Sequence, residues 1–190
     1  MKEEEKEVLK VLEENARLSY GEIARLVGVA GGEAGGEAGG EAGGEAGGEV
    51  GGEAGGEAAV KKIISELEKK KIIKKYTVVA DWEKAGVESV QALIDIKVSP
   101  ERETGYDPVA ERISRFPEVR SVRLVSGEYD LSVLVEGKTM REVAYFVAEK
   151  IAPLEQVRNT LTHFLLKTYK EDGEIYGEEE GEGKRLAVTL

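Results

Sequence analysis

The chain has 190 residues, with 27 Lys and Arg against 38 Asp and Glu, a formal net charge of −11 and no cysteine. Without cysteine, the chain can form neither disulfides nor thiolate metal sites. Its apolar runs are far shorter than the roughly 18 residues of a membrane span, and its charged start lacks the apolar stretch of a signal peptide. We therefore expect a soluble cytoplasmic protein with no membrane partner.

A four-residue unit, GGEA, is repeated seven times over residues 31–58, with Val50 the only deviation. Half of these residues are glycine, which disfavours both helix and strand, so we expect a flexible acidic loop that the fold tolerates. Its seven glutamates take the net charge from −4 to −11, so the overall acidity says little about partners. Residues 171–190 are also acidic and rich in glycine, and we expect this tail to be mostly disordered.

Amphipathic segments lie on both sides of the repeat. Residues 4–16 carry apolar side chains at helical spacing. Residues 17–29 predict a short second helix, in which Ser19 stands three residues before Glu22, the spacing of a capping box. After the repeat, residues 58–76 again place their apolar side chains on one helical face.

With six of the seven units removed, the order reads helix, short turn, helix, and then a β-branched strand over residues 72–82. This order predicts a winged helix-turn-helix DNA-binding domain over residues 1–80, with the flexible insertion 31–58 in the turn before the recognition helix. Three short helices around a small apolar cluster could also form a plain interaction module, and that alternative stays open.

The local charge favours DNA binding. Residues 58–76 carry seven lysines against two glutamates, which concentrates positive charge on the last helix of the motif and the segment after it. A solvated lysine face would show the same pattern. The residues that we expect to contact double-stranded DNA are Lys61, Lys62, Ser65, Lys69, Lys74 and Lys75.

From residue 89 the pattern changes to the order βαββαβ, which predicts a ferredoxin-like domain over residues 89–170 and an α+β protein overall. The strands are apolar on both faces: in the last one, Leu161 and Leu165 lie on one face, and Phe164 and Leu166 on the other. Two helices cover only one face of a four-stranded sheet. The uncovered face therefore predicts a homodimer joined through the sheets.

In these features the chain resembles the Lrp/AsnC, or feast/famine, family of transcription regulators. The resemblance covers residues 2–30 and 58–170, through LSYGEIARLVGV and VKKIISELEKKKIIKKY in the first half and FPEVRSVRLVSGEYDLSVLVEG in the second. It implies DNA binding, an amino acid or similar small effector, and homodimers that can assemble into octamers. The repeat stands where family members have a tight turn.

The resemblance also implies a place for the effector. The turn SGEYD is similar to the family's turn beside the effector pocket, and it supplies Gly127, Glu128, Tyr129 and Asp130 as effector-binding residues. A glycine lets backbone N–H groups approach a ligand carboxylate, and Asp130 could accept a hydrogen bond from an α-ammonium group. Without the resemblance, the same residues would suit an ordinary β-turn.

The sequence does not indicate an enzyme. The one histidine, His163, has no second histidine or cysteine with which to hold a transition metal. There is no nucleophile elbow, phosphate-binding loop or dinucleotide fingerprint, so we expect no cofactor. Two alternatives to a regulator remain: a ligand-sensing oligomer that has lost DNA binding because of the insertion and, more distantly, an AsnC-like tetrapyrrole decarboxylase.

Overall fold

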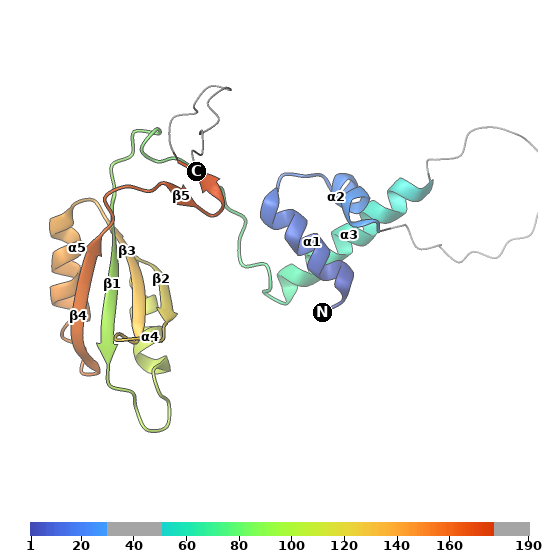
Figure 1. The fold of residues 1–190 in the computed structure, drawn as a ribbon. Helices are drawn as coiled ribbons and strands as arrows, with labels where there is room; N and C mark the ends of the chain where they lie inside the picture. Colours follow the sequence, from blue (N-terminus) through green and yellow to red (C-terminus); the bar gives the residue numbers. More distant parts are fainter. Residues whose placement is uncertain (30–50, 177–190) are drawn as a thin grey trace, which may run out of the picture. The chain divides into compact units, whose positions relative to one another are not determined.

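The computed structural model describes residues 1–29 and 51–176, with side chains from residue 55 onward in the second range. The chain divides into two compact units between Val78 and Val79 (Figure 1). The first unit is helical and the second is built on a four-stranded sheet. Each unit has its own cluster of buried apolar side chains, so each is described by itself.

The first unit contains three helices, α1 (Glu3–Glu14), α2 (Tyr20–Val27) and α3 (Gly51–Lys69). The predicted capping box begins α2: the Ser19 hydroxyl accepts from the Glu22 N–H at 3.3 Å, and the Glu22 carboxylate accepts from the Ser19 N–H at 2.7 Å. Gly28 ends α2 in the left-handed region, with φ of 70°. Both signals were readable in the sequence.

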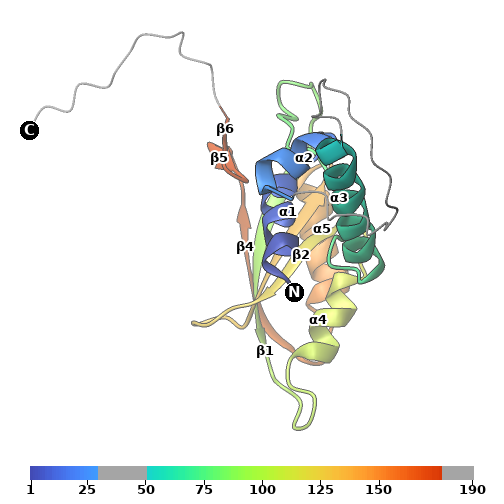
Figure 2. The same cartoon turned by 90° about the vertical axis from the view of Figure 1, so that its right-hand side faces the viewer.

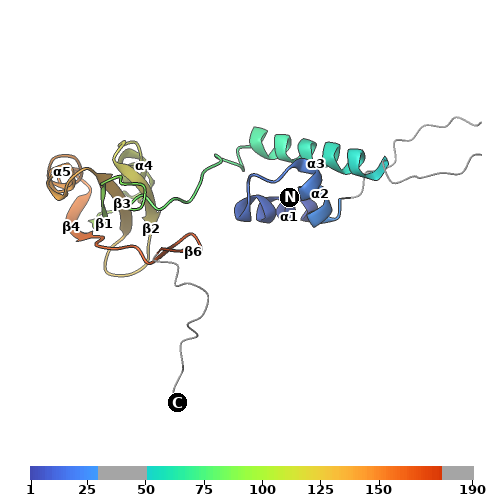
Figure 3. The same cartoon turned by 90° about the horizontal axis from the view of Figure 1, so that it is seen from above.

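The three helices pack around one small core. Its buried members come from all three helices, and they are Val8, Ile23, Ala24, Val60 and Ile64. Figures 1 and 3 show α3 packed against α1 and α2 and crossing α1, the arrangement of a helix-turn-helix motif. The helix-turn-helix prediction is confirmed.

The start of α3 corrects the prediction for the repeat. Residues 51–58 are helical, although a flexible loop was predicted over 31–58. The first turn of α3 extends past the end of α2 in both views that show it (Figures 1 and 3). Gly56 is buried against α2, and this tertiary contact overrides the low helix propensity of glycine. The rest of the predicted loop, residues 31–50, lies outside the described residues.

The strand predicted over residues 72–82 is not formed. No helix or strand is assigned from Lys70 to Ser89, and Val78 and Val79 are exposed. A β-branched run becomes a strand only where another strand can pair with it, and the described chain brings none alongside. Ile73 packs against the helical core instead.

The second unit has the predicted order βαββαβ. Its main elements are β1 (Val90–Val98), α4 (Asp107–Ser114), β2 (Val119–Leu124), β3 (Leu131–Gly137), α5 (Met140–Phe146), a π-helical turn (Val147–Ile151) and β4 (Val157–Phe164). The strands form an antiparallel sheet in the order β2-β3-β1-β4. This is the ferredoxin-like topology, so the α+β fold class is confirmed.

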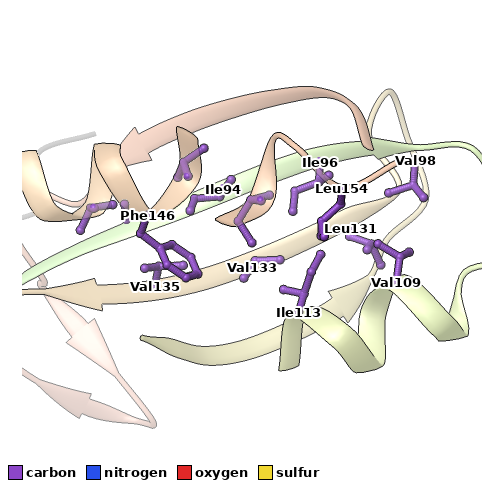
Figure 4. Packing of buried hydrophobic residues seen from close by; sticks show 14 residues of the cluster. Ile94, Ile96, Val98, Val109, Ile113, Leu131, Val133, Val135, Phe146 and Leu154 are labelled. Atoms are coloured by element: carbon purple, nitrogen blue, oxygen red, sulfur yellow. The ribbon is translucent and has the colours of Figure 1, made fainter. Parts of the chain in front are cut away.

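Both helices cover the same face of the sheet (Figures 2 and 3). Along β1, alternate side chains are buried beneath them, from Ala92 to Val98. Ile113 of α4 and Phe146 of α5 point into the core from the helices (Figure 4). The opposite face of the sheet is left without a covering layer among the described residues.

A short hairpin follows β4 and corrects the prediction for the tail. It consists of β5 (Lys170–Glu171) and β6 (Glu174–Ile175). Asp172 and Gly173 form its turn at positive φ values of 47° and 90°, which suits these two residue types. Residues 171–190 were predicted to be mostly disordered, and residues 171–176 of this segment lie in and beside the hairpin. Residues 177–190 lie outside the described residues.

Candidate functional site

The exposed face of α3 carries the predicted DNA contacts. Lys61, Lys62 and Lys69 are exposed and Ser65 is half-buried. With 3.6 residues per turn, positions 62, 65 and 69 fall on one stripe, opposite the buried side chains of the helix, and Lys61 flanks it. The structure therefore brings four of the six predicted residues onto one helical surface.

These lysines are not held by acidic neighbours. Among the residues that the structure describes, no ion pair involves Lys61, Lys62 or Lys69, whereas Lys70 lies 3.5 Å from Glu5 and 3.9 Å from Glu66. The N–H of residue 2 lowers the pKa of the Glu5 carboxyl first, and Lys70 lowers it further. Lys70 thus fastens α3 to α1, while the lysines on the stripe remain available to phosphates.

Lys74 and Lys75 are exposed on the irregular segment that follows α3. Next to them, the Tyr76 hydroxyl donates to the Glu68 carboxylate at 2.9 Å. Burial, and then the hydrogen bond to Glu68, raise the pKa of Tyr76 to about 12. The phenol therefore stays protonated and keeps the segment with these two lysines beside the end of α3.

The beginning of α3 is made of repeat residues. Recognition helices read base edges mainly with their N-terminal residues, and here Gly51 begins the helix and Glu57 is exposed near its start. Lys61 follows Gly51 by ten residues, which is about 15 Å at 1.5 Å per residue. The lysines therefore lie in the middle and at the end of the helix, and the exposed Glu57 precedes them.

The predicted effector turn connects β2 and β3. Gly127 has a φ of 146°, and both Gly127 and Glu128 are exposed. The Tyr129 hydroxyl accepts from the Asn159 side-chain amide at 3.5 Å, which links the turn to β4. The turn is open to solvent on the single chain.

Asp130 is engaged within the chain. Its carboxylate accepts from the Val98 N–H at 2.8 Å and from the Lys97 ammonium at 3.2 Å, next to the register shift between those two residues. The Val98 N–H lowers the pKa of Asp130 most, against the opposing effect of burial, and Lys97 lowers it further. This carboxylate stabilises the end of β1, a role that the sequence did not indicate.

A pocket of about 760 Å³ lies elsewhere in the second unit and is open to solvent. It is formed by residues 80–91 and by the chain from the end of β4 to the hairpin, and none of the four predicted turn residues lines it. The Tyr176 hydroxyl donates to the Ala80 carbonyl at 3.3 Å and ties the two walls together. The two walls are far apart in the sequence, so the sequence did not predict this pocket.

His163 lies on the uncovered face of the sheet. Its Nε2 is 3.4 Å from the Asp95 carboxylate on the neighbouring strand β1. Within residues 1–29 and 51–176, no group of His, Cys, Asp or Glu side chains could hold a metal ion. In the same part of the chain, every helix is too short or too polar to cross a membrane.

A helix-turn-helix lobe with exposed lysines on its last helix, joined to a ferredoxin-like domain, defines the class of two-domain helix-turn-helix regulators. The family described as the Lrp/AsnC ligand binding domain matches residues 91–175. YugG of Bacillus subtilis (strain 168), an uncharacterized HTH-type transcriptional regulator, is 42% identical over 188 residues, covering 98% of this chain and 97% of the relative. The chain belongs to the Lrp/AsnC family of transcriptional regulators.

More distant proteins are similar in sequence or in fold. HTH-type transcriptional regulator FL11 of Pyrococcus horikoshii is 26% identical over 171 residues, covering 90% of this chain and 93% of the relative. The structure of AsnC from E. coli matches with a TM-score of 0.58 at 16% identity, over 90% of this chain and 95% of that one. The structure of regulator NMB0573 of Neisseria meningitidis in complex with L-Met matches with a TM-score of 0.60 at 19% identity. The match covers 90% of this chain and 93% of that one.

Asp130→Ala is expected to lower the free energy of unfolding of the second unit by about 1–3 kcal/mol, because it leaves the Val98 N–H without its charged acceptor. Urea unfolding followed by circular dichroism measures this change. The pKa of Asp130 is lowered in the folded state, so its contribution is present above the unfolded pKa of about 3.9 and is lost as the pH falls through the folded pKa.

The stability difference between the wild type and Asp130→Asn should therefore shrink as the pH is lowered below about 4. The asparagine variant keeps an acceptor for the Val98 N–H and removes the charge facing Lys97. A difference that stays constant from neutral to acidic pH would show that the Asp130 charge contributes nothing to folding.

Proposed function

We propose that the protein is a DNA-binding transcriptional regulator whose activity is modulated by a small effector, most simply an amino acid. The observation that carries the DNA-binding part is the stripe of exposed lysines on α3, which have no acidic partner among the described residues. Family membership supports the regulatory part. The effector-binding part of the proposal rests on the turn Gly127–Asp130 between β2 and β3.

The proposed DNA contacts divide by position. Lys61, Lys62, Ser65 and Lys69 lie on α3, where a helix can enter the major groove. Lys74 and Lys75 follow the helix and would contact phosphates on one side of the groove. Glu57, near the start of the helix, works against phosphate contact there.

The proposed effector site is the turn Gly127–Asp130. Its exposed glycine leaves backbone N–H groups accessible to a carboxylate, and Glu128 is exposed beside it to meet an ammonium group. Asp130 would act by holding the turn in place, since its carboxylate already accepts two hydrogen bonds. Because the turn is open on the single chain, a second copy would have to complete any enclosed pocket. The L-Met in the Neisseria structure agrees with an amino-acid ligand.

The uncovered sheet face is proposed as the homodimer interface. Leu93 pairs with Leu134 across β1 and β3, and Leu161 lies on the same face in β4 with 42% of its surface exposed. An apolar strip across the middle of an open sheet needs a covering layer, and a second copy of the sheet supplies one. Assembly of dimers into octamers would use other surfaces.

A second candidate is a ligand-sensing oligomer that no longer binds DNA. The observation that favours it is the repeat, which places glutamates at the start of α3. Here the repeat is taken as an insertion relative to the family.

The tetrapyrrole decarboxylase alternative has less support, because the similar proteins reported above are named as transcription regulators. A mobility-shift assay with the duplex upstream of the protein's own coding region separates the first two candidates.

Lys62→Ala is expected to weaken binding to that duplex by about threefold to tenfold at low salt, since it removes one phosphate contact from the exposed stripe. Lys10→Ala is the matched control, because Lys10 is an exposed lysine on α1 and its loss changes the net charge equally. Fluorescence anisotropy with labelled duplex measures both. Equal weakening by the two variants would mean that net charge, and not α3, governs binding.

The full chain is expected to be a dimer or larger at micromolar concentration by light scattering, and Leu161→Lys should shift it toward the monomer by placing a charge in the interface. Leu124→Lys is the control, because Leu124 is 62% exposed and lies at the end of β2. A wild-type chain that is a well-folded monomer would rule out the sheet-to-sheet dimer.

A further inference from the structure

The last repeat unit is part of the helix-turn-helix lobe. A Cβ atom at Gly56 would lie 2.7 Å from the carbonyl oxygen of Val29 and 3.2 Å from the Cβ of Ala24. The first distance is too short for any side chain, and a backbone oxygen cannot rotate away. Gly56 is therefore the residue that allows α3 to pass close to the end of α2.

The same contact brings the chain just before the repeat against the last repeat unit. Val29 is the last described residue before the repeat, and Gly56 packs against its carbonyl oxygen. Val29 and Gly56 can keep this contact whatever the number of residues that connect them. Closing a longer connection costs only a logarithmic increase in entropy.

The period of the repeat preserves this contact. Removing any whole unit of four residues leaves Gly-Gly-Glu-Ala in the same positions before Ala59. Removing half a unit does not: without Glu57 and Ala58, Ala54 moves into the position of Gly56. A change in repeat length by whole units therefore keeps a glycine at the position of Gly56, whereas the removal of half a unit does not.

Each unit also carries one glutamate that is tethered to the start of the recognition helix. A unit therefore adds one negative charge to the chain ahead of the DNA-facing lysines. Phosphate binding depends on this local charge, and its range grows as salt is lowered.

We infer that the number of repeat units sets the strength of DNA binding, and that Gly56 is the positioning residue that keeps the recognition helix in place while that number varies. This inference rests on the proposed DNA-binding function. It assigns the last unit a structural role and assigns the others a graded electrostatic one.

The structural part is tested by thermal unfolding of full-length variants, followed by circular dichroism of the helices. Removal of residues 31–34 or 31–42 should leave Tm unchanged or slightly raised. Removal of Glu57 and Ala58, or Gly56→Ala, should lower Tm of the helical lobe by about 5–10 °C. Gly21→Ala is the control for the substitution: Gly21 is also helical but has nothing within 4 Å of its Cβ position, so Tm should not fall.

The electrostatic part is tested by titrating the same full-length variants with two duplexes, the protein's own upstream region and a random-sequence fragment. Affinity should rise by about 1.5-fold for each unit removed, and by more at lower salt. Removal of residues 31–42 takes away three glutamates. The triple variant Glu33→Gln, Glu37→Gln, Glu41→Gln takes away the same charge at full length and should show the same gain of about threefold.

The outcomes separate the two proposals. If every variant binds DNA equally well, DNA binding stands and control by unit number is overturned. If shortening raises affinity but the glutamine variant does not, length and not charge is the cause, and the electrostatic role is wrong. If no variant binds either duplex, the proposed DNA-binding function is wrong, and so is the graded electrostatic role of the repeat units. Gly56→Ala with an unchanged Tm would overturn the role of Gly56.

Discussion

The close approach of α3 to the end of α2 at Gly56 determines the geometry of the DNA-binding lobe. Because no side chain intervenes between Gly56 and the Val29 carbonyl, the two helices can share one small core. That core fixes the rotation of α3, and the rotation puts Lys62, Ser65 and Lys69 on the exposed side. The ion pair between Lys70 and Glu5 holds the same helix to α1 from its other end. A repeat that looks like an addition to the lobe thus supplies the contact on which its shape depends.

The second unit is organised by the asymmetry of its sheet. One face is covered by α4 and α5 (Figures 2 and 4), and the other carries Leu93, Leu134 and Leu161 among charged groups such as the Asp95–His163 pair. The turn that would hold an effector leads into β3, and the carboxylate of Asp130 connects it to β1. A ligand at the turn and a partner on the sheet would therefore act on the same strands, which is a direct physical route for an effector to influence assembly.

Much of this was predictable from local signals in the sequence. The capping box at Ser19 marked the start of α2, and the order βαββαβ marked the second unit. The features that sequence reasoning missed all depend on contacts between distant residues. Glycine propensity argued against a helix at 51–58, but the contact between Gly56 and α2 was not visible. The run 72–82 had strand propensity, but no other strand among the described residues pairs with it. The engagement of Asp130 by Val98 needed the register of β1 against β3, and the pocket beside Trp82 needed the hairpin that was expected to be disordered.

The central claim is that lysines on and after α3 bind DNA phosphates, and the salt dependence of duplex affinity tests it most directly. Lys61, Lys62, Lys69, Lys74 and Lys75 are the five candidate cations. If each contacts a phosphate, the logarithm of the affinity should fall against the logarithm of the salt concentration with a slope of about −4 to −5 for each bound lobe. A steep slope of this size for the full chain supports the account. A slope near zero, or no binding at low salt, would contradict it.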